Sequence, residues 1–242
     1  MIVPTMTLPE IHAELLKDCE DIQASVEHKM KLFGSVVLKS SRYPVVRRYA
    51  IKSKNRRNVF YVRFTAFKRG FWKNPAIHTY CIYSRPEGLH CAFLDPIHRA
   101  SIIFPPHFFS RYRERIVRDD SLGTEELIHL FSSRTWALSF QPVSAEVQQM
   151  MRQWREYPRD VDVPIVAFGP DGMLFGQCTG HVTLVKTIVS PSMLHEDQVP
   201  VYESLRECYH RKLRDYYPRE EAEWLMEMDK DYDKKSLSLT HL

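Results

Sequence analysis

The stretch Asn58-Val59-Phe60-Tyr61-Val62-Arg63-Phe64 decides the class of fold. Its apolar residues Phe60, Val62 and Phe64 recur at every second position, which is typical of a β-strand with one buried face. β-Branched and aromatic residues also fit a pleated, half-buried surface well. The pattern therefore predicts a strand over residues 59–67.

Further strands are expected on both sides of this one. The turn signals Lys54-Asn55 and Pro86-Glu87-Gly88 separate β-branched and aromatic runs, and Pro170-Asp171-Gly172 predicts a hairpin further along the chain. The remaining predicted strands are 36–38, 45–51, 77–83, 89–94, 100–104, 163–168, 173–179 and 182–189.

Helical spacing of apolar residues appears in the other segments. Ile11, Leu15, Cys19, Ile22 and Val26 predict a helix over residues 8–31 that ends before Gly34. Other predicted helices are 107–117, 124–132, 144–157, 199–216 and 219–232. We expect an α+β fold, a mainly antiparallel sheet with an N-terminal helix, a central helical insert and C-terminal helices.

The predicted domains are a basic N-terminal helix and strands (1–88), an α+β core (89–195) and a charged helical tail (196–242), with one continuous domain as the alternative. The five cysteines are scattered and form no CxxC pair, and there is no HExxH, GxGxxG or P-loop motif. No metal and no cofactor are expected. Lacking a signal peptide or an apolar run of spanning length, the chain is expected to be cytoplasmic, with no membrane contact.

Charge is distributed unevenly along the chain. From Lys29 to Pro86 there are fifteen Lys and Arg and no Asp or Glu, whereas ordinary surfaces mix both signs. Such a block suits a phosphate backbone, and its interleaved aromatics suit base stacking, so nucleic acid is the expected partner, with RNA preferred. The candidate nucleic-acid-binding residues are Arg47, Arg48, Lys52, Lys54, Arg56, Arg57, Arg63, Lys68 and Arg69.

The same block has two other interpretations. Its aromatics could form the inward face of strands and its cations a solvated outer face. Alternatively, residues 196–235, with twelve Asp and Glu against eight Lys and Arg, could cover it within one molecule or between two copies. The protein would then be a protein-interaction module.

A second candidate site lies in the segment from Ile102 to Ile116. At helical spacing, His107, Arg111 and Glu114 share one face, with Arg115 at its edge. An imidazole can transfer a proton and guanidinium groups can bind a phosphate, so this face suits phosphoryl chemistry. It could also be the solvated face of an amphipathic helix, or bind phosphate without catalysis.

The spacing His107-xxx-Arg111-xxx-Arg115, followed by a helical insert, a hairpin and a last strand reading Val185-Lys186-Thr187-Ile188-Val189, resembles the barnase/EndoU/RelE-like nuclease superfamily over about residues 89–191. The resemblance implies a metal-independent ribonuclease of toxin or mobile-element type, which cleaves RNA by transesterification. His107 would transfer the proton, Arg111 and Arg115 would bind the phosphate, and Thr187 would face the same site.

This sequence departs from that pattern because no second acid or base occupies a recognisable place. A ribonuclease needs one group to activate the ribose 2′-hydroxyl and another to protonate the leaving oxygen. His129, His181 and Tyr112 are the candidates for that second group. A nucleic-acid-binding protein without catalysis is the alternative function.

Overall fold

The computed structural model describes residues 2–55, 58–95, 99–135, 138–143 and 162–231. The chain forms two compact units, Met1–Phe104 and Pro105–Leu242. Both contain helices and antiparallel strands, so the predicted α+β class is confirmed. The expected domain boundary at residues 88–89 falls in the turn of a hairpin, where Arg85 pairs with Gly88.

Unit 1 begins with the long helix α1 (Leu8–Lys39). Glu10 closes its first turn, because its carboxylate accepts hydrogen bonds from the Thr7 backbone N–H (2.7 Å) and hydroxyl (2.8 Å). These bonds lower the pKa of Glu10. The residues that the helix buries follow its helical period: Ile11, Leu15, Ile22, Phe33 and Val37.

Helix α1 corrects two predictions, because it continues through Gly34 and includes residues 36–38, which were expected to form a strand. The physical reason is packing. A Cβ atom at Gly34 would lie 2.6 Å from the backbone oxygen of Trp72, so glycine lets this segment approach the helix closely. Buried Phe33 and Val37, four residues apart, anchor the added turns.

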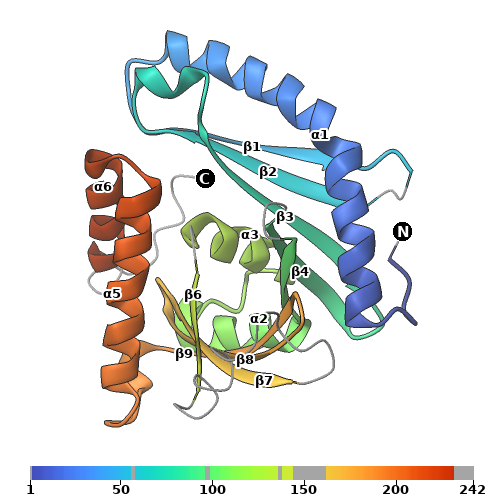
Figure 1. Cartoon of the computed structure of the whole chain (residues 1–242), viewed down its shortest axis with the longest axis vertical. Coiled ribbons are helices and arrows are strands. Elements are labelled where there is room, and N and C mark those ends of the chain that lie inside the picture. The colour runs from blue at the N-terminus through green and yellow to red at the C-terminus, as the bar shows by residue number, and fades with distance from the viewer. Residues whose placement is uncertain (1, 56–57, 96–98, 136–137, 144–161, 232–242) are drawn as a thin grey trace. The chain divides into compact units, whose positions relative to one another are not determined.

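Five strands of unit 1 follow in sequence order, each antiparallel to the next. They are β1 (Val45–Lys52), β2 (Val59–Ala66), β3 (Ala76–Arg85), β4 (Gly88–Asp95) and β5 (Ala100–Phe104). A short 3-10 helix, η1 (Arg69–Trp72), joins β2 to β3. Figure 1 shows α1 lying across one face of the strands of this unit.

Strand β2 shows which sheet face α1 covers. Phe33 of α1 stacks on Phe64 with ring centroids 5.6 Å apart, so Phe64 points toward the helix. Side chains alternate along a strand, and cross-strand partners share a face. Arg47, the partner of Phe64, therefore lies on the α1 side, whereas Arg48 and its partner Arg63 lie on the opposite side.

Unit 2 begins with helix α2 (Pro106–Tyr112), a π-helical turn η2 (Arg113–Val117) and helix α3 (Thr124–Arg134). Its strands are β6 (Ser139–Pro142), β7 (Val163–Gly169), β8 (Gly172–Thr179) and β9 (Val182–Val189), ordered β9-β8-β7-β6. A 3-10 turn, η3 (Pro191–Met193), leads to helices α5 (Val199–Tyr216) and α6 (Arg219–Asp231).

The hairpin of β7 and β8 turns at Pro170-Asp171, as predicted. Gly172 has a φ of +151°, and a Cβ atom there would lie 2.3 Å from the Val189 backbone oxygen, so glycine suits the position. Strand β6 was not predicted. The predicted helix 144–157 lies outside the described residues. No helix among the described residues is long and apolar enough to cross a membrane.

Candidate functional site

Helix α2 carries the predicted His-Arg cluster, and its end departs from α-helical geometry. The backbone N–H of Arg118 donates to the Arg113 carbonyl (2.7 Å), five residues back, and Arg118 has a left-handed φ of +55°. π-Turns inside helices are frequent at functional sites. A π-turn contains more residues than an α-turn. Arg115 is therefore rotated about the helix axis away from the position that regular α-helical spacing predicts.

His107 and Arg111 lie on the exposed side of α2. The Arg111 guanidinium donates to the Glu114 carboxylate at 2.7 Å, and both side chains are more than half exposed, at 51% and 61%. The His107 imidazole has no hydrogen-bond partner among the described residues. Solvent therefore reaches the face that the spacing predicts, although one of its cations already has an anionic neighbour.

Arg115 and Thr187, 72 positions apart in the sequence, lie within hydrogen-bond distance of each other. Arg115 Nη1 donates to the Thr187 hydroxyl (3.3 Å) and to the Ile188 carbonyl (2.7 Å). These bonds tie η2 to strand β9, against which α2 packs. Arg115 is half-buried, and its bonds hold the end of this helix on the sheet.

Tyr112 lies in a buried network that sequence reasoning missed. Its hydroxyl donates to Asp171 Oδ2 (2.6 Å), and Arg134 contacts both the other Asp171 oxygen (3.1 Å) and the Tyr112 oxygen (3.3 Å). The Arg134 and Asp171 side chains are only 5% and 3% exposed. Burial and the neighbouring carboxylate raise the pKa of Tyr112, and burial raises the pKa of Asp171 despite Arg134. Tyr112 is therefore a structural residue and does not supply the missing acid.

The two histidines considered as partners of His107 lie elsewhere in unit 2. His129 is on α3, with Nε2 3.7 Å from a Glu125 carboxylate oxygen. His181 is exposed at the turn between β8 and β9. Within the described part of the chain, neither forms a hydrogen bond or ring contact with His107. The structure thus brings together Arg115 and Thr187, whereas neither His129 nor His181 contacts His107 in the part of the chain that it describes.

In unit 1, two acidic residues of α1 lie beside one end of the basic block. The Asp21 carboxylate accepts hydrogen bonds from the backbone N–H of Lys54 (2.6 Å) and of Asn55 (3.2 Å). Asp18 accepts one from the Asn58 amide (2.5 Å). The turn between β1 and β2 is therefore bound to carboxylates, although no acidic residue occurs there in the sequence.

The other end of this unit collects cations from three segments. The last turns of α1, the chain leading into β1, and η1 meet there, since Trp72 packs on Gly34 and the start of β1 pairs with the end of β2. We call this the basic surface; its exposed cations are Lys31, Lys39, Arg42, Arg47, Lys68, Arg69 and Lys73.

Aromatic side chains accompany these cations. Lys73 Nζ lies 4.8 Å from the centroid of the Trp72 ring, and Trp72 is 38% exposed. Lys29 Nζ lies 5.4 Å from the Tyr49 ring on the α1 side of the sheet. No acidic residue occurs between Lys29 and Pro86, so none of the three segments contributes one.

The predicted nucleic-acid-binding residues divide among four places. Arg47, Lys68 and Arg69 belong to the basic surface, whereas Arg48 and Lys52 are exposed on the opposite face of β1. Lys54 lies at the turn held by Asp21, and Arg56 and Arg57 lie outside the described residues. Arg63 is only 5% exposed, so its selection as a surface contact was wrong.

The candidate residues named from the sequence did not include Lys31, Lys39, Arg42 or Lys73 of the basic surface. The signal that would have identified Lys31 and Lys39 is the length of α1, because extending the helix beyond Gly34 brings both beside η1. Among the described residues no group of His, Cys, Asp or Glu has an arrangement that could hold a metal ion.

Comparison with known proteins gave no match: no family model, no curated protein and no solved structure is significantly similar to this chain.

Proposed function

We propose that the protein binds nucleic acid, with RNA as the preferred form, through the basic surface of unit 1. The observation that carries this proposal is spatial. Seven exposed cations from three segments lie at one end of the unit, while the α1 carboxylates Asp18 and Asp21 bind the turn at the other end. A surface of one charge sign attracts a polyanion from a distance and binds its phosphates at short range.

The strength of this binding should depend steeply on salt. Each phosphate contact with single-stranded nucleic acid contributes about 0.7 to the slope of log affinity against log salt concentration. If most of the seven cations make a contact, the slope should approach about −4 to −5. Exposed Trp72 beside Lys73 would add base stacking, which favours unpaired RNA over a duplex.

A matched pair of charge reversals tests the location. Lys68→Glu with Arg69→Glu changes the basic surface, whereas Lys52→Glu with Lys54→Glu changes the net charge equally elsewhere on the same unit. Fluorescence anisotropy with a labelled 20-nucleotide RNA should show at least tenfold weaker binding for the first variant. The second should stay within about threefold, since long-range screening leaves little effect of distant charges. Equal losses would contradict the proposed location.

A second candidate function, RNA cleavage at helix α2, has one observation in its favour. Arg115 lies within hydrogen-bond distance of Thr187, the strand residue that the nuclease resemblance assigns to the same site, and His107 is exposed on the same helix. We propose it as the secondary activity, with His107 moving the proton and Arg111 binding the phosphate. Within the described ranges no second acid accompanies His107, so water or the substrate would have to take its place.

Cleavage and binding are separable by one experiment. Purified protein and its His107→Ala variant are incubated with labelled single-stranded RNA in EDTA, and both gel retardation and product ends are followed. Cleavage by the parent alone, with 2′,3′-cyclic phosphate ends, supports the catalytic role of His107. Retardation by both proteins without cleavage leaves RNA binding as the function and contradicts the cleavage proposal.

A further inference from the structure

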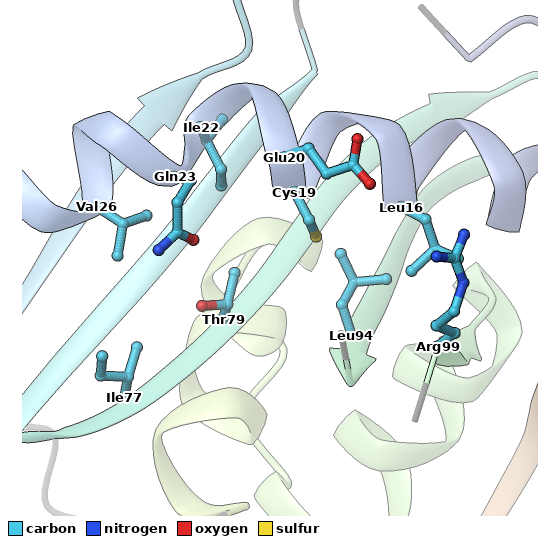
Figure 2. Close-up of a pocket in the computed structure, with 10 residues that line it drawn as sticks. All are labelled: Leu16, Cys19, Glu20, Ile22, Gln23, Val26, Ile77, Thr79, Leu94 and Arg99. Carbon is cyan, nitrogen blue, oxygen red and sulfur yellow. The ribbon is translucent and has the colours of Figure 1, made fainter. Parts of the chain in front are cut away.

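Unit 1 contains a cavity of about 690 Å³ between α1 and the strands β3 and β4 (Figure 2). One wall is the side of α1 from Leu16 to Val26, and the floor is formed by Ile77 and Thr79 of β3 and Leu94 of β4. Ten residues of α-helix span about 15 Å, so the cavity is elongated. Its size is in the range that small-molecule sites occupy, about 300–1,000 Å³.

The apolar lining of this cavity is not covered by the protein itself. Ile77 is 49% exposed, and Leu16, Val26 and Leu94 are half-buried. Apolar side chains that line one open hollow are a common feature of ligand sites, whereas single exposed ones are ordinary. The Cys19 thiol, also in the wall, has its pKa raised to about 11 by burial, so it is a packing group and not a nucleophile.

Two opposite charges lie at one end of the cavity. Figure 2 shows the Glu20 carboxylate and the Arg99 guanidinium toward the end formed by Leu16, away from Val26 and Ile77. Within the described residues, neither Glu20 nor Arg99 forms a hydrogen bond or an ion pair. Arg99 also has a left-handed φ of +50°, a conformation that costs a non-glycine residue energy and that recurs at ligand-binding positions.

We propose that this cavity binds a short apolar peptide with free ends, whose ammonium meets Glu20 and whose carboxylate meets Arg99. Figure 2 draws both charged groups toward the Leu16 end of the cavity, and a dipeptide, whose two termini lie close together, suits that placement. The apolar side chains of the ligand would then lie against Leu16 and Leu94, next to the charged end. This complementarity accounts for both unpaired charges and for the apolar body of the site.

Capped peptides test the two charged contacts separately. Isothermal titration of the full chain would compare Leu-Phe with N-acetyl-Leu-Phe and with Leu-Phe-amide. Because both protein groups are exposed, each lost contact should weaken binding by roughly threefold to tenfold. A capped peptide that binds as tightly as Leu-Phe, or no detectable binding of Leu-Phe at millimolar concentration, would overturn the proposal.

Protein variants assign each terminus to its residue. In Glu20→Gln, Leu-Phe and N-acetyl-Leu-Phe should bind equally; in Arg99→Asn, Leu-Phe and Leu-Phe-amide should bind equally. Asparagine suits this position because it tolerates a left-handed φ. Glu87→Gln and Arg48→Asn remove the same charges elsewhere in unit 1 and should leave the discrimination unchanged. Discrimination that persists in both cavity variants would contradict the assignment.

A third variant tests whether the ligand lies in the cavity at all. Thr79→Phe places a ring on the cavity floor and should abolish Leu-Phe binding, whereas Thr79→Val keeps the shape of the side chain and should retain it. Circular dichroism of both variants checks the fold. Normal binding by a folded Thr79→Phe protein would overturn the proposal, independently of the result with RNA.

Discussion

Three arginines of unit 2 and two arginines of unit 1 have opposite surroundings. In unit 2, Arg113 donates to the Leu122 carbonyl (2.7 Å), Arg115 to Ile188 and Arg134 to Asp171. Arg115 and Arg134 join segments that are distant along the chain, and Arg113 holds the loop that follows η2. In unit 1, Arg42 and Arg69 are exposed on a surface whose own segments supply no carboxylate.

This difference indicates that an arginine is a candidate for binding a ligand only when its guanidinium group is not already bonded within the fold. A buried guanidinium with a carboxylate partner is part of the scaffold, and its loss should appear as reduced stability. An exposed one without an acidic neighbour adds little to stability, and its loss should appear as reduced affinity. The following predictions test that division.

The largest effect is expected at the buried network of unit 2. Asp171→Ala leaves the Arg134 guanidinium buried without its charged partner and should lower the free energy of unfolding by about 3–5 kcal/mol. Urea unfolding followed by circular dichroism measures the change. RNA affinity, measured under conditions where the variant is folded, should remain within about twofold, because the network is not part of the basic surface.

A double variant provides the control for this prediction. Asp171→Leu combined with Arg134→Met replaces both charges with apolar groups and should recover much of the lost stability, because no unpaired charge remains. A single Asp171→Ala change that costs less than about 1 kcal/mol would mean that the pair is as weak as a surface ion pair. The distinction between the two classes of arginine would then fail.

The next effect concerns the contact that assembles the basic surface. Gly34→Ala places a Cβ atom 2.6 Å from the Trp72 backbone oxygen and should destabilise the protein by about 1–3 kcal/mol, although alanine normally favours a helix. Gly70→Ala, in η1, is the matched control because its Cβ atom would meet nothing within 4 Å. Thermal unfolding of both variants measures the difference in stability. Equal melting temperatures would contradict the close approach of Trp72 to Gly34.

Gly34 also explains why part of the fold could not be predicted from the sequence. Local signals located the strands of the hairpins and most helices, since period-two patterns and turn residues act over a few positions. The end of α1 depends on a contact with Trp72, 38 positions away, which no local pattern records. The same limit applies to β6, which is only four residues long.

The candidate site shows the same division between local and distant information. Helical spacing predicted that His107 and Arg111 share one face of a helix, and both are exposed. The resemblance assigned Thr187 to the same site as Arg115, and the two side chains are hydrogen-bonded. Burial of Arg63 could not be foreseen, because period-two alternation assigned it to the outer face of β2. The carboxylate of Asp21 lies beside Lys54 only because α1 crosses the sheet.

A pH dependence is expected from unit 1. His78 Nε2 is buried without a hydrogen-bond partner among the described residues, and the ring packs on Phe93 with centroids 4.8 Å apart. Burial, with the nearby Arg63 charge, lowers the pKa of His78 well below its usual value of 6.5. Between the two pKa values the unfolded state binds more protons, so stability should fall as the pH drops below about 6.5, by up to about 1.4 kcal/mol per pH unit.

The test is urea unfolding of the parent and of His78→Phe between pH 5 and 7.5. Phenylalanine keeps an aromatic ring against Phe93 and removes the titrating group, so the slope should become shallower. His28→Phe, at an exposed position of α1, is the control and should leave the slope unchanged. An unaltered slope in His78→Phe would show that another group causes the pH dependence.

The smallest effect on stability is expected at the exposed pair of α2. Glu114→Gln removes the carboxylate bound to Arg111 at 2.7 Å, and because both side chains are largely exposed the loss should be about 0–0.5 kcal/mol. The change also frees the Arg111 guanidinium. If α2 binds phosphate, Glu114→Gln should strengthen RNA retention or cleavage, and adding Arg111→Gln should reverse the gain. If α2 is scaffold alone, neither variant will alter retention or cleavage. Arg111 will then differ in function from the exposed arginines of the basic surface, although it shares their exposure.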